Sequence, residues 1–246
     1  MLNKIFILFY IFSLFLYASE LAIVTKSKGA VTYKKNTLKD FEKTVKAGKE
    51  LYDDDLLKTG IDGFVMFMYL DDGTLIKVHK NSEVYISGKI SDRSINKRVN
   101  AGEGFFRFDV KEQKGDEFTV VTPSSVASVK GTDFVIDIGP EGDVFYGYEG
   151  IVEVSNKISN TKLRLQKDNK IQSLKNGDIS VNIMTPTDYN NINNIELEIE
   201  TNDQQEVVPE IDNQESGGSN QNIKEMRIKV LNDDGVEKEI IIRYTN

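Results

Sequence analysis

Between Leu21 and Met184 the chain repeats one pattern, in which short runs of alternating apolar and polar residues are separated by turn signals. The runs are rich in Val, Ile, Phe and Tyr and recur about every ten residues, the spacing of strands in all-β rolls, sandwiches and barrels. No stretch of this region shows the 3.6-residue apolar period of an amphipathic helix. The pattern therefore predicts an all-β fold, a compact roll or sandwich of many short strands.

One hairpin and one loop can be placed on this pattern. The apolar run Gly63–Leu70 is followed by Asp72-Gly73 and then by a second run, Thr74–Val78. Asp-Gly between two apolar runs is a strong hairpin signal, because glycine tolerates positive φ. The polar segment Ser91–Asn100 interrupts the apolar runs, and we interpret it as a loop.

The composition excludes several classes of chemistry. The chain has no Cys, which removes disulfide scaffolds, thiolate metal sites and cysteine nucleophiles. His79 is the one histidine, so a site that needs two imidazoles cannot form. The net charge of −8 argues against nucleic acid as a partner. We therefore predict a protein that is not an enzyme and has no catalytic residues, no metal site and no cofactor.

The first nineteen residues have the layout of a secretory signal peptide. Lys4 precedes the apolar run Ile5–Leu16, and the small residues Ala18 and Ser19 follow it. The alternative is an uncleaved anchor helix, but a spanning helix needs about 17–25 apolar residues and this run is shorter. We therefore expect cleavage after Ala18 or Ser19, export to the periplasm or the extracellular space, and a mature protein that is not integral to the membrane.

The net negative charge is concentrated in residues 185–222. That segment contains nine acidic residues and no Lys or Arg, and it is rich in Asn and Gln. A composition of this kind buries too little apolar area to offset chain entropy. We interpret it as a flexible acidic linker after a β domain of residues 20–184, with an acidic arm for a basic partner as the alternative.

Residues 223–246 carry a hairpin signature. Two alternating runs, Glu225–Leu231 and Val236–Tyr244, flank a turn that ends in Gly235. A lone two-stranded hairpin is only marginally stable in water, and its apolar side chains would leave open edges. We therefore expect it to dock, either onto its own β domain, which the tether favours, or onto a partner chain.

An ordered series of short motifs runs from Thr122 to Asn156. It consists of Thr-Pro, a basic residue, Gly-Thr, a strand, a turn with glycine, and Glu-Gly before Val-x-Val. The positions are Thr122-Pro123, Ala127, Lys130, Gly131-Thr132, Phe134, Gly142, Glu149-Gly150 and Val152-Glu153-Val154. This series resembles the signature of the FecR-like domain family, and weaker matches upstream extend the resemblance over about residues 21–156. Lys130 stands where Arg is more usual, which keeps the charge but loses the planar fork.

The resemblance implies a binding or signal-relay role without catalysis. In regulators of this family, a cytoplasmic arm that controls a sigma factor precedes a membrane helix and the exported domain. This chain has the predicted signal peptide in place of that arm, so the sigma-factor role does not carry over.

We expect the notable residues of the motif and its surroundings to have structural roles rather than to bind a ligand. We expect Gly131, Gly142 and Gly150 to relieve positive φ or crowding at turns. Lys130 is expected on a solvated face or in an internal ion pair, and His79 as an exposed or packed imidazole. Asp53-Asp54-Asp55 lacks the Asx, Gly and Glu spacing of a calcium hand. No binding residue can be assigned from the sequence.

Two functions from different classes are consistent with these observations. The first is an exported interaction module that relays an envelope signal or binds an envelope protein. The second is a structural or adhesive envelope protein that binds glycan or matrix on the same scaffold.

Overall fold

The computed structural model describes residues 19–41, 44–91, 94–113, 118–200, 223–231 and 237–245. The predicted signal peptide, residues 1–18, lies outside them, as do residues 201–222. The elements are β1 (Ala22–Lys28), β2 (Val31–Lys34), β3 (Glu50–Leu51), β4 (Asp55–Thr59), β5 (Phe64–Tyr69), β6 (Leu75–Val78), β7 (Glu83–Ser91), β8 (Ser94–Ala101), β9 (Gly104–Val110), β10 (Phe118–Val121), β11 (Ser125–Val129), β12 (Thr132–Ile138), β13 (Gly142–Glu149), β14 (Ile151–Asn156), β15 (Lys162–Gln166), β16 (Asn169–Leu174), β17 (Ile179–Ile183), α1 (Pro186–Glu200), β18 (Ile223–Leu231) and β19 (Glu237–Thr245).

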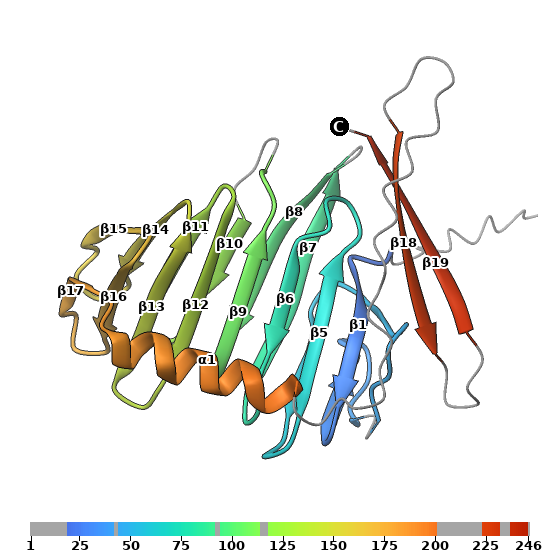
Figure 1. The fold of residues 1–246 in the computed structure, drawn as a ribbon, viewed down its shortest axis with the longest axis horizontal. Helices are drawn as coiled ribbons and strands as arrows, with labels where there is room; N and C mark the ends of the chain where they lie inside the picture. The colour runs from blue at the N-terminus through green and yellow to red at the C-terminus, as the bar shows by residue number, and fades with distance from the viewer. Residues whose placement is uncertain are drawn as a thin grey trace, which may run out of the picture.

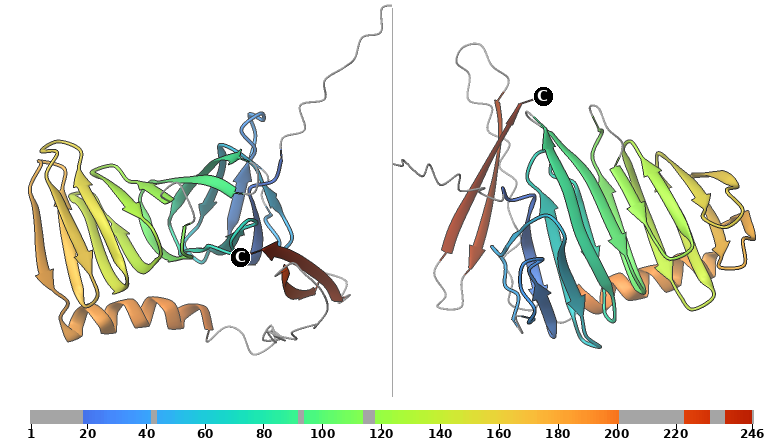
Figure 2. Two further views of the ribbon diagram at one scale, coloured as in Figure 1. Left: turned by 90° about the horizontal axis from the view of Figure 1, so that it is seen from above. Right: turned by 180° about the vertical axis from the view of Figure 1, so that it is seen from behind.

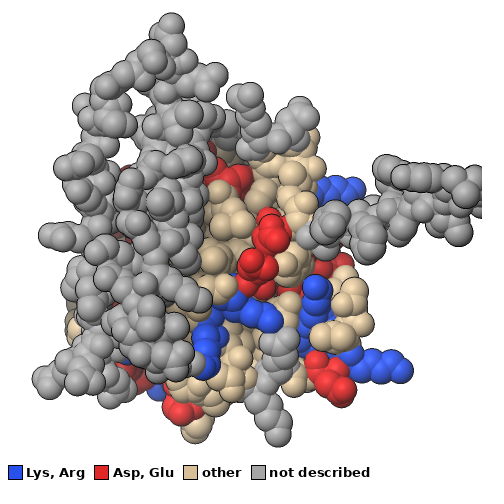
Figure 3. Space-filling view, turned by 90° about the vertical axis from the view of Figure 1, so that its right-hand side faces the viewer, with Lys and Arg blue, Asp and Glu red and all other residues tan. Residues whose placement is uncertain are grey.

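Two large sheets stack face to face (Figures 1 and 2). The nine-stranded sheet has the order β17-β16-β13-β12-β9-β6-β5-β1-β3, and the eight-stranded sheet has the order β15-β14-β11-β10-β8-β7-β4-β2. The described strands pair antiparallel except β8 and β10, which are parallel. The prediction of an all-β sandwich of many short strands is confirmed. At the end where β1 lies, the described surface carries acidic and basic side chains intermixed (Figure 3).

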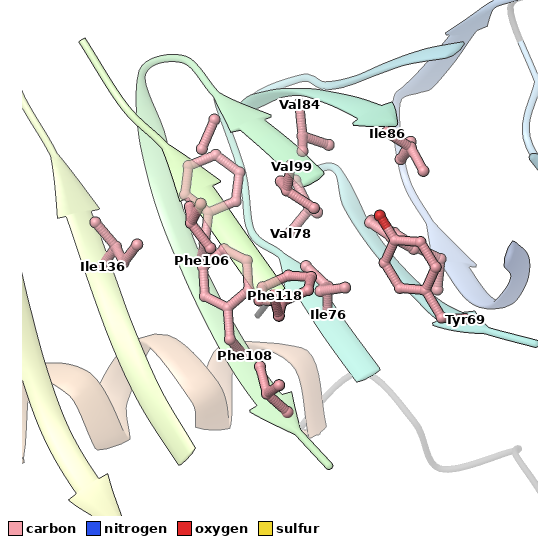
Figure 4. Packing of buried hydrophobic residues seen from close by; sticks show 14 of the residues in the cluster. Tyr69, Ile76, Val78, Val84, Ile86, Val99, Phe106, Phe108, Phe118 and Ile136 are labelled. Carbon is pink, nitrogen blue, oxygen red and sulfur yellow. The ribbon is translucent and has the colours of Figure 1, made fainter. Parts of the chain in front are cut away.

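The core lies between the two sheets and is rich in aromatic side chains (Figure 4). The period-two alternation of each strand creates it: Phe106 and Phe108 of β9 point inward, whereas Arg107 between them points outward. Phe108 stacks on Phe134 of β12 with ring centroids 4.9 Å apart. Burying rings of this size provides the main stabilisation that a chain without disulfides needs.

The Asp-Gly hairpin is confirmed. β5 and β6 pair antiparallel on either side of Gly73, whose φ is +77°. The Asp72 carboxylate accepts a hydrogen bond from the backbone N–H of Thr74 at 2.8 Å, which fixes the turn. The sequence therefore predicted both the position and the chemistry of this connection.

The interpretation of Ser91–Asn100 as a loop is wrong, because β7 and β8 form a long antiparallel hairpin across that segment. Lys97 of β8 made the segment look polar, yet it is almost fully buried. Its ammonium lies 2.6 Å from a carboxylate oxygen of Asp71 and 2.9 Å from one of Asp72. A lysine can occupy an inward position when two carboxylates replace its water.

The prediction of a flexible linker over residues 185–222 is wrong for Pro186–Glu200, which form α1. The helix begins with a capping box. Asp188 accepts a hydrogen bond from the Thr185 N–H at 2.7 Å, and the Thr185 hydroxyl accepts one from the Asp188 N–H at 3.3 Å. Pro186 occupies the first helical position, which suits its fixed φ. Contacts between one face of α1 and the sheet stabilise the helix, although the composition of the segment did not predict a folded element.

β18 and β19 pair antiparallel in a two-stranded sheet of their own. Among the described residues neither strand hydrogen-bonds to either large sheet, and docking of the hairpin stays a prediction. No helix in the described parts of the chain combines the length and the apolar character needed to cross a membrane.

Candidate interaction site

Helix α1 lies across the outer face of the nine-stranded sheet, roughly perpendicular to its strands (Figures 1 and 2). A second apolar cluster, separate from the main core, fills the space beneath it. Phe105 of β9 and Val135 of β12 point outward from the sheet and pack against Met184 and Ile192. Ile192 is 2% exposed. The helix is therefore part of the folded domain.

Basic side chains from the sheet hold the helix along its length. Lys170 of β16 donates to both carboxylate oxygens of Asp188 at 2.9 Å in the first turn of the helix. Lys28 of β1 donates to the carbonyl oxygen of Ile199 at 2.8 Å in the last turn. A carboxylate at the N-terminus and a cation at the C-terminus both complement the helix dipole. The charges thus fix the direction of the helix across the sheet.

Glu196 is the centre of the charge cluster under the helix. One of its carboxylate oxygens lies 2.6 Å from Lys77 Nζ, and the other lies 3.3 Å from His79 Nε2 and 4.0 Å from Arg107 Nη1. Burial alone would raise the pKa of Glu196, but His79 and Lys77 outweigh burial and lower the pKa to about 2. The ionised carboxylate is therefore strongly favoured at this position.

Arg107 connects this cluster to the sheet. Its Nε and Nη2 atoms donate to the two oxygens of Asp133 at 3.1 and 2.7 Å, a bidentate pair. Its guanidinium carbon also lies 4.7 Å from the centre of the Tyr148 ring, within the range of cation–π attraction. Arg107 is thus held in one orientation by neighbours on two other strands.

A groove of about 600 Å³ runs beside the helix. Half-exposed Leu197 and partly buried Leu75 line it, next to the charged pair of Arg107 and Asp133. Apolar side chains beside fixed charges suit a protein segment that carries both kinds of side chain. The complete lining is Leu75, Lys77, Arg107, Asp109, Asp133, Asn193, Glu196 and Leu197.

The three glycines of the motif have the structural roles that the sequence predicts, relief of positive φ or of crowding. Gly150 has a φ of +72°, and a Cβ there would overlap the carbonyl oxygen of Gly131. A Cβ at Gly142 would overlap the carbonyl oxygen of Ser173. Gly131 has no positive φ, and a Cβ there would lie 3.1 Å from Glu112 Cα. Gly131 therefore serves close packing of the backbone.

A second groove, of about 820 Å³, surrounds the Gly131 turn. Exposed Lys130 lines it together with Arg164 and the carboxylates of Glu149 and Glu153. The charged side chains there are of both signs, and the lining comes from residues 109–164, without a contribution from α1.

The three aspartates Asp53–Asp55 brace neighbouring strands. Asp55 is fully buried and accepts hydrogen bonds from Tyr33 Oη at 2.7 Å and from the backbone N–H of Tyr52 at 2.8 Å. Asp54 accepts one from the Ser87 hydroxyl at 2.6 Å, and Asp53 accepts one from the backbone N–H of Gly88 at 2.9 Å. Hydrogen bonds of this kind make the three carboxylates structural.

His79 is packed between aromatic rings, in agreement with one of the two interpretations of this residue. Its ring centroid lies 5.4 Å from that of Phe64 and 5.1 Å from that of Phe105, in edge-to-face arrangements. No group of three or more His, Asp or Glu side chains suited to a metal ion occurs in the part of the chain that the structure describes.

Sequence reasoning missed Glu196, Lys77 and Arg107, the residues at the centre of the site. One available signal was the capping box Thr185-Pro186-Thr187-Asp188, which marks the start of a helix. The other was the outward position of Lys77 and Arg107 in their strands. Neither signal identifies the contact between helix and sheet, which depends on the tertiary fold.

Comparison with known proteins supports the resemblance found in the sequence. The family model described as "FecR protein" matches residues 55–153, which span β4 to β14. No functionally curated protein matches the chain.

Two similar solved structures are crystal structures of a "putative anti-sigma factor" from Parabacteroides distasonis ATCC 8503, at 1.65 and 2.50 Å resolution. The first is 20% identical, with a TM-score of 0.46 over 55% of this chain and 62% of that chain. The second is 22% identical, with a TM-score of 0.41 over 49% of this chain and 56% of that chain. The chain thus spans less than two thirds of either structure. Residues 55–153, less than half of the chain, match the FecR family, and the resemblance is established for that part.

Proposed function

We propose that this chain is an exported, non-catalytic module that relays a signal in the cell envelope by binding an envelope protein in the groove beside α1. The observation that carries the proposal is the groove itself, which joins the FecR domain to a helix outside the matched residues. Its floor is formed by β6, β9 and β12, and its wall by Asn193, Glu196 and Leu197 of α1. A partner that binds there contacts both units at once, so binding is coupled to how α1 sits on the sheet.

Site-specific photo-crosslinking in the native envelope tests the location of the partner. A photoreactive residue at Leu197 is expected to give a discrete crosslinked protein, because this half-exposed side chain faces the groove. The control is the same residue at Ile151, which is equally exposed on the other sheet. Crosslinks of equal pattern from both positions, or none from Leu197, contradict the proposal.

Export is the second part of the proposal, and the layout of residues 1–19 supports it. N-terminal sequencing of the protein recovered from the producing cells is expected to start near Ser19 or Glu20. Recovery of intact Met1 in the membrane fraction would show that the segment is retained as an anchor.

A further inference from the structure

β17 forms one edge of the nine-stranded sheet, at the far left of Figure 1. Its five residues, Ile179–Ile183, include no charge and no proline. Val181 is 46% exposed and Ile183 is 76% exposed. Proteins usually protect an edge strand with charge, proline or shortness, because unpaired backbone groups invite another strand.

The other three edges of the two large sheets are protected in these ways. β3 has only two residues, and one of them is Glu50. β2 is short and ends in Lys34. β15 carries Lys162 and Arg164. β17 is the exception among the described edges of these two sheets.

The backbone of β17 presents free hydrogen-bonding groups in a defined pattern. The N–H of Leu174 donates to the carbonyl of Asp178, and the N–H of Met184 donates to the carbonyl of Asp168, both at 2.8 Å. In an antiparallel pair the bonded positions alternate, so residues 178, 180, 182 and 184 point their backbone groups toward β16. Residues 179, 181 and 183 therefore point theirs away from the sheet.

The side chains of β17 are sorted by face. Val181 lies opposite buried Ile171 in the register, and Ile179 packs against the main core. Ile179, Val181 and Ile183 thus share the inner face, whereas Ser180 and Asn182 share the outer face. The edge is apolar on the side that continues the core and polar on the side that meets water.

We propose that β17 is a self-association edge, at which a second copy of this chain adds its own β17 antiparallel. In the register centred on Val181, that residue faces the partner subunit's Val181, and Ile179 faces the partner subunit's Ile183. This register uses every outward backbone group of the strand and places apolar side chains opposite apolar ones. No like charges meet, because the strand has none.

The surroundings of the edge leave room for this pairing. The eight-stranded sheet ends at β15, which contacts β16 and β17 across the sandwich, so β17 is the last strand on this side. Helix α1 starts beside β16 and runs toward β1, away from the edge. A two-fold pairing uses the same strand on both copies, so it closes as a dimer.

Disulfide trapping tests the register directly, because the chain contains no Cys. In a hydrogen-bonded antiparallel pair the facing Cα atoms are about 5.5 Å apart, which a disulfide can bridge. Val181→Cys is therefore expected to give a disulfide-linked dimer under mild oxidation. Asn182→Cys is the matched control: its copies are offset by two residues and lie beyond about 7 Å, so it stays monomeric. Equal crosslinking of both variants, or none of Val181→Cys, overturns the proposal.

Molar mass in solution supplies an independent readout. The unmodified protein is expected to show a concentration-dependent dimer by light scattering. Val181→Lys is expected to be monomeric, because it places two ammonium groups opposite each other. Since position 181 is exposed, the melting temperature of this variant should match that of the unmodified protein at concentrations where the latter is monomeric. Ile151→Lys, on the other sheet, is expected to retain the dimer. A monomeric unmodified protein, or a dimer that survives Val181→Lys, refutes the assignment.

Discussion

Replacing Glu196 with Gln should destabilise the protein, because the carboxylate lies among three basic side chains. The pKa of Glu196 falls from its ordinary value of 4.5 to about 2. Each pKa unit of that difference corresponds to about 1.4 kcal/mol, so the ionised carboxylate stabilises the folded protein by about 3 kcal/mol. The Glu196 side chain is 16% exposed. Screening by water therefore reduces the expected loss of unfolding free energy to about 2 kcal/mol.

The sign of the pH dependence makes the prediction specific. A lowered pKa in the folded state means that the stabilisation is fully present above pH 4.5 and disappears as the pH falls toward about 2. Urea unfolding should therefore separate Glu196→Gln from the unmodified protein at pH 7 and bring the two together near pH 2. Hydrogen exchange of the α1 amides should accelerate in the variant at pH 7.

Glu198 provides the matched control on the same helix. Its carboxylate lies 2.6 Å from Lys80 Nζ, but both side chains are about half exposed. Glu198→Gln should therefore lower the free energy of unfolding by less than about 0.5 kcal/mol. Equal effects of the two substitutions at pH 7, or an effect of Glu196→Gln that does not change with pH, would refute the role of the buried cluster.

Three further predictions concern the body and the tail. Gly150→Ala should lower the free energy of unfolding by about 2–4 kcal/mol, because the new Cβ overlaps a carbonyl oxygen at a positive φ. Gly48 also has a positive φ but lies in open space, so Gly48→Ala should lower the free energy of unfolding by about 1 kcal/mol in the same urea assay. Lys97→Met should lower the free energy of unfolding by about 3–5 kcal/mol, because it leaves the buried Asp71 carboxylate without its cation. Adding Asp71→Asn should recover part of that loss, and a double variant whose loss equals the sum of the two single losses would contradict the coupling. Truncation after Asn222 should lower the melting temperature if the hairpin docks on its own domain; unchanged melting with lost association indicates a partner, and no change in either contradicts docking.

The sequence predicted the class of fold and the hairpin turns because both depend on local chemistry. Alternation fixes which side of a strand is buried, and the Gly73 turn needs only its own residues. Lys97 was misjudged because its burial depends on Asp71, which is distant in the chain. Composition likewise misjudged α1, since Ile192 is buried against side chains that only the folded sheet brings together. The interaction site lies in these long-range contacts.

The path of α1 determines how the domain responds to force. The chain enters at β1 and, after crossing the sheet, leaves α1 beside β1 again, where Lys28 holds the carbonyl of Ile199. Tension applied to the tail therefore loads the helix from its C-terminal end. The contact of Ile199 lies nearest the tail, that of Glu196 follows and that of Asp188 is farthest, so a pull would load them in that order. Detachment of the helix would uncover Phe105 and Val135, the apolar residues that it covers on the outer face of the sheet.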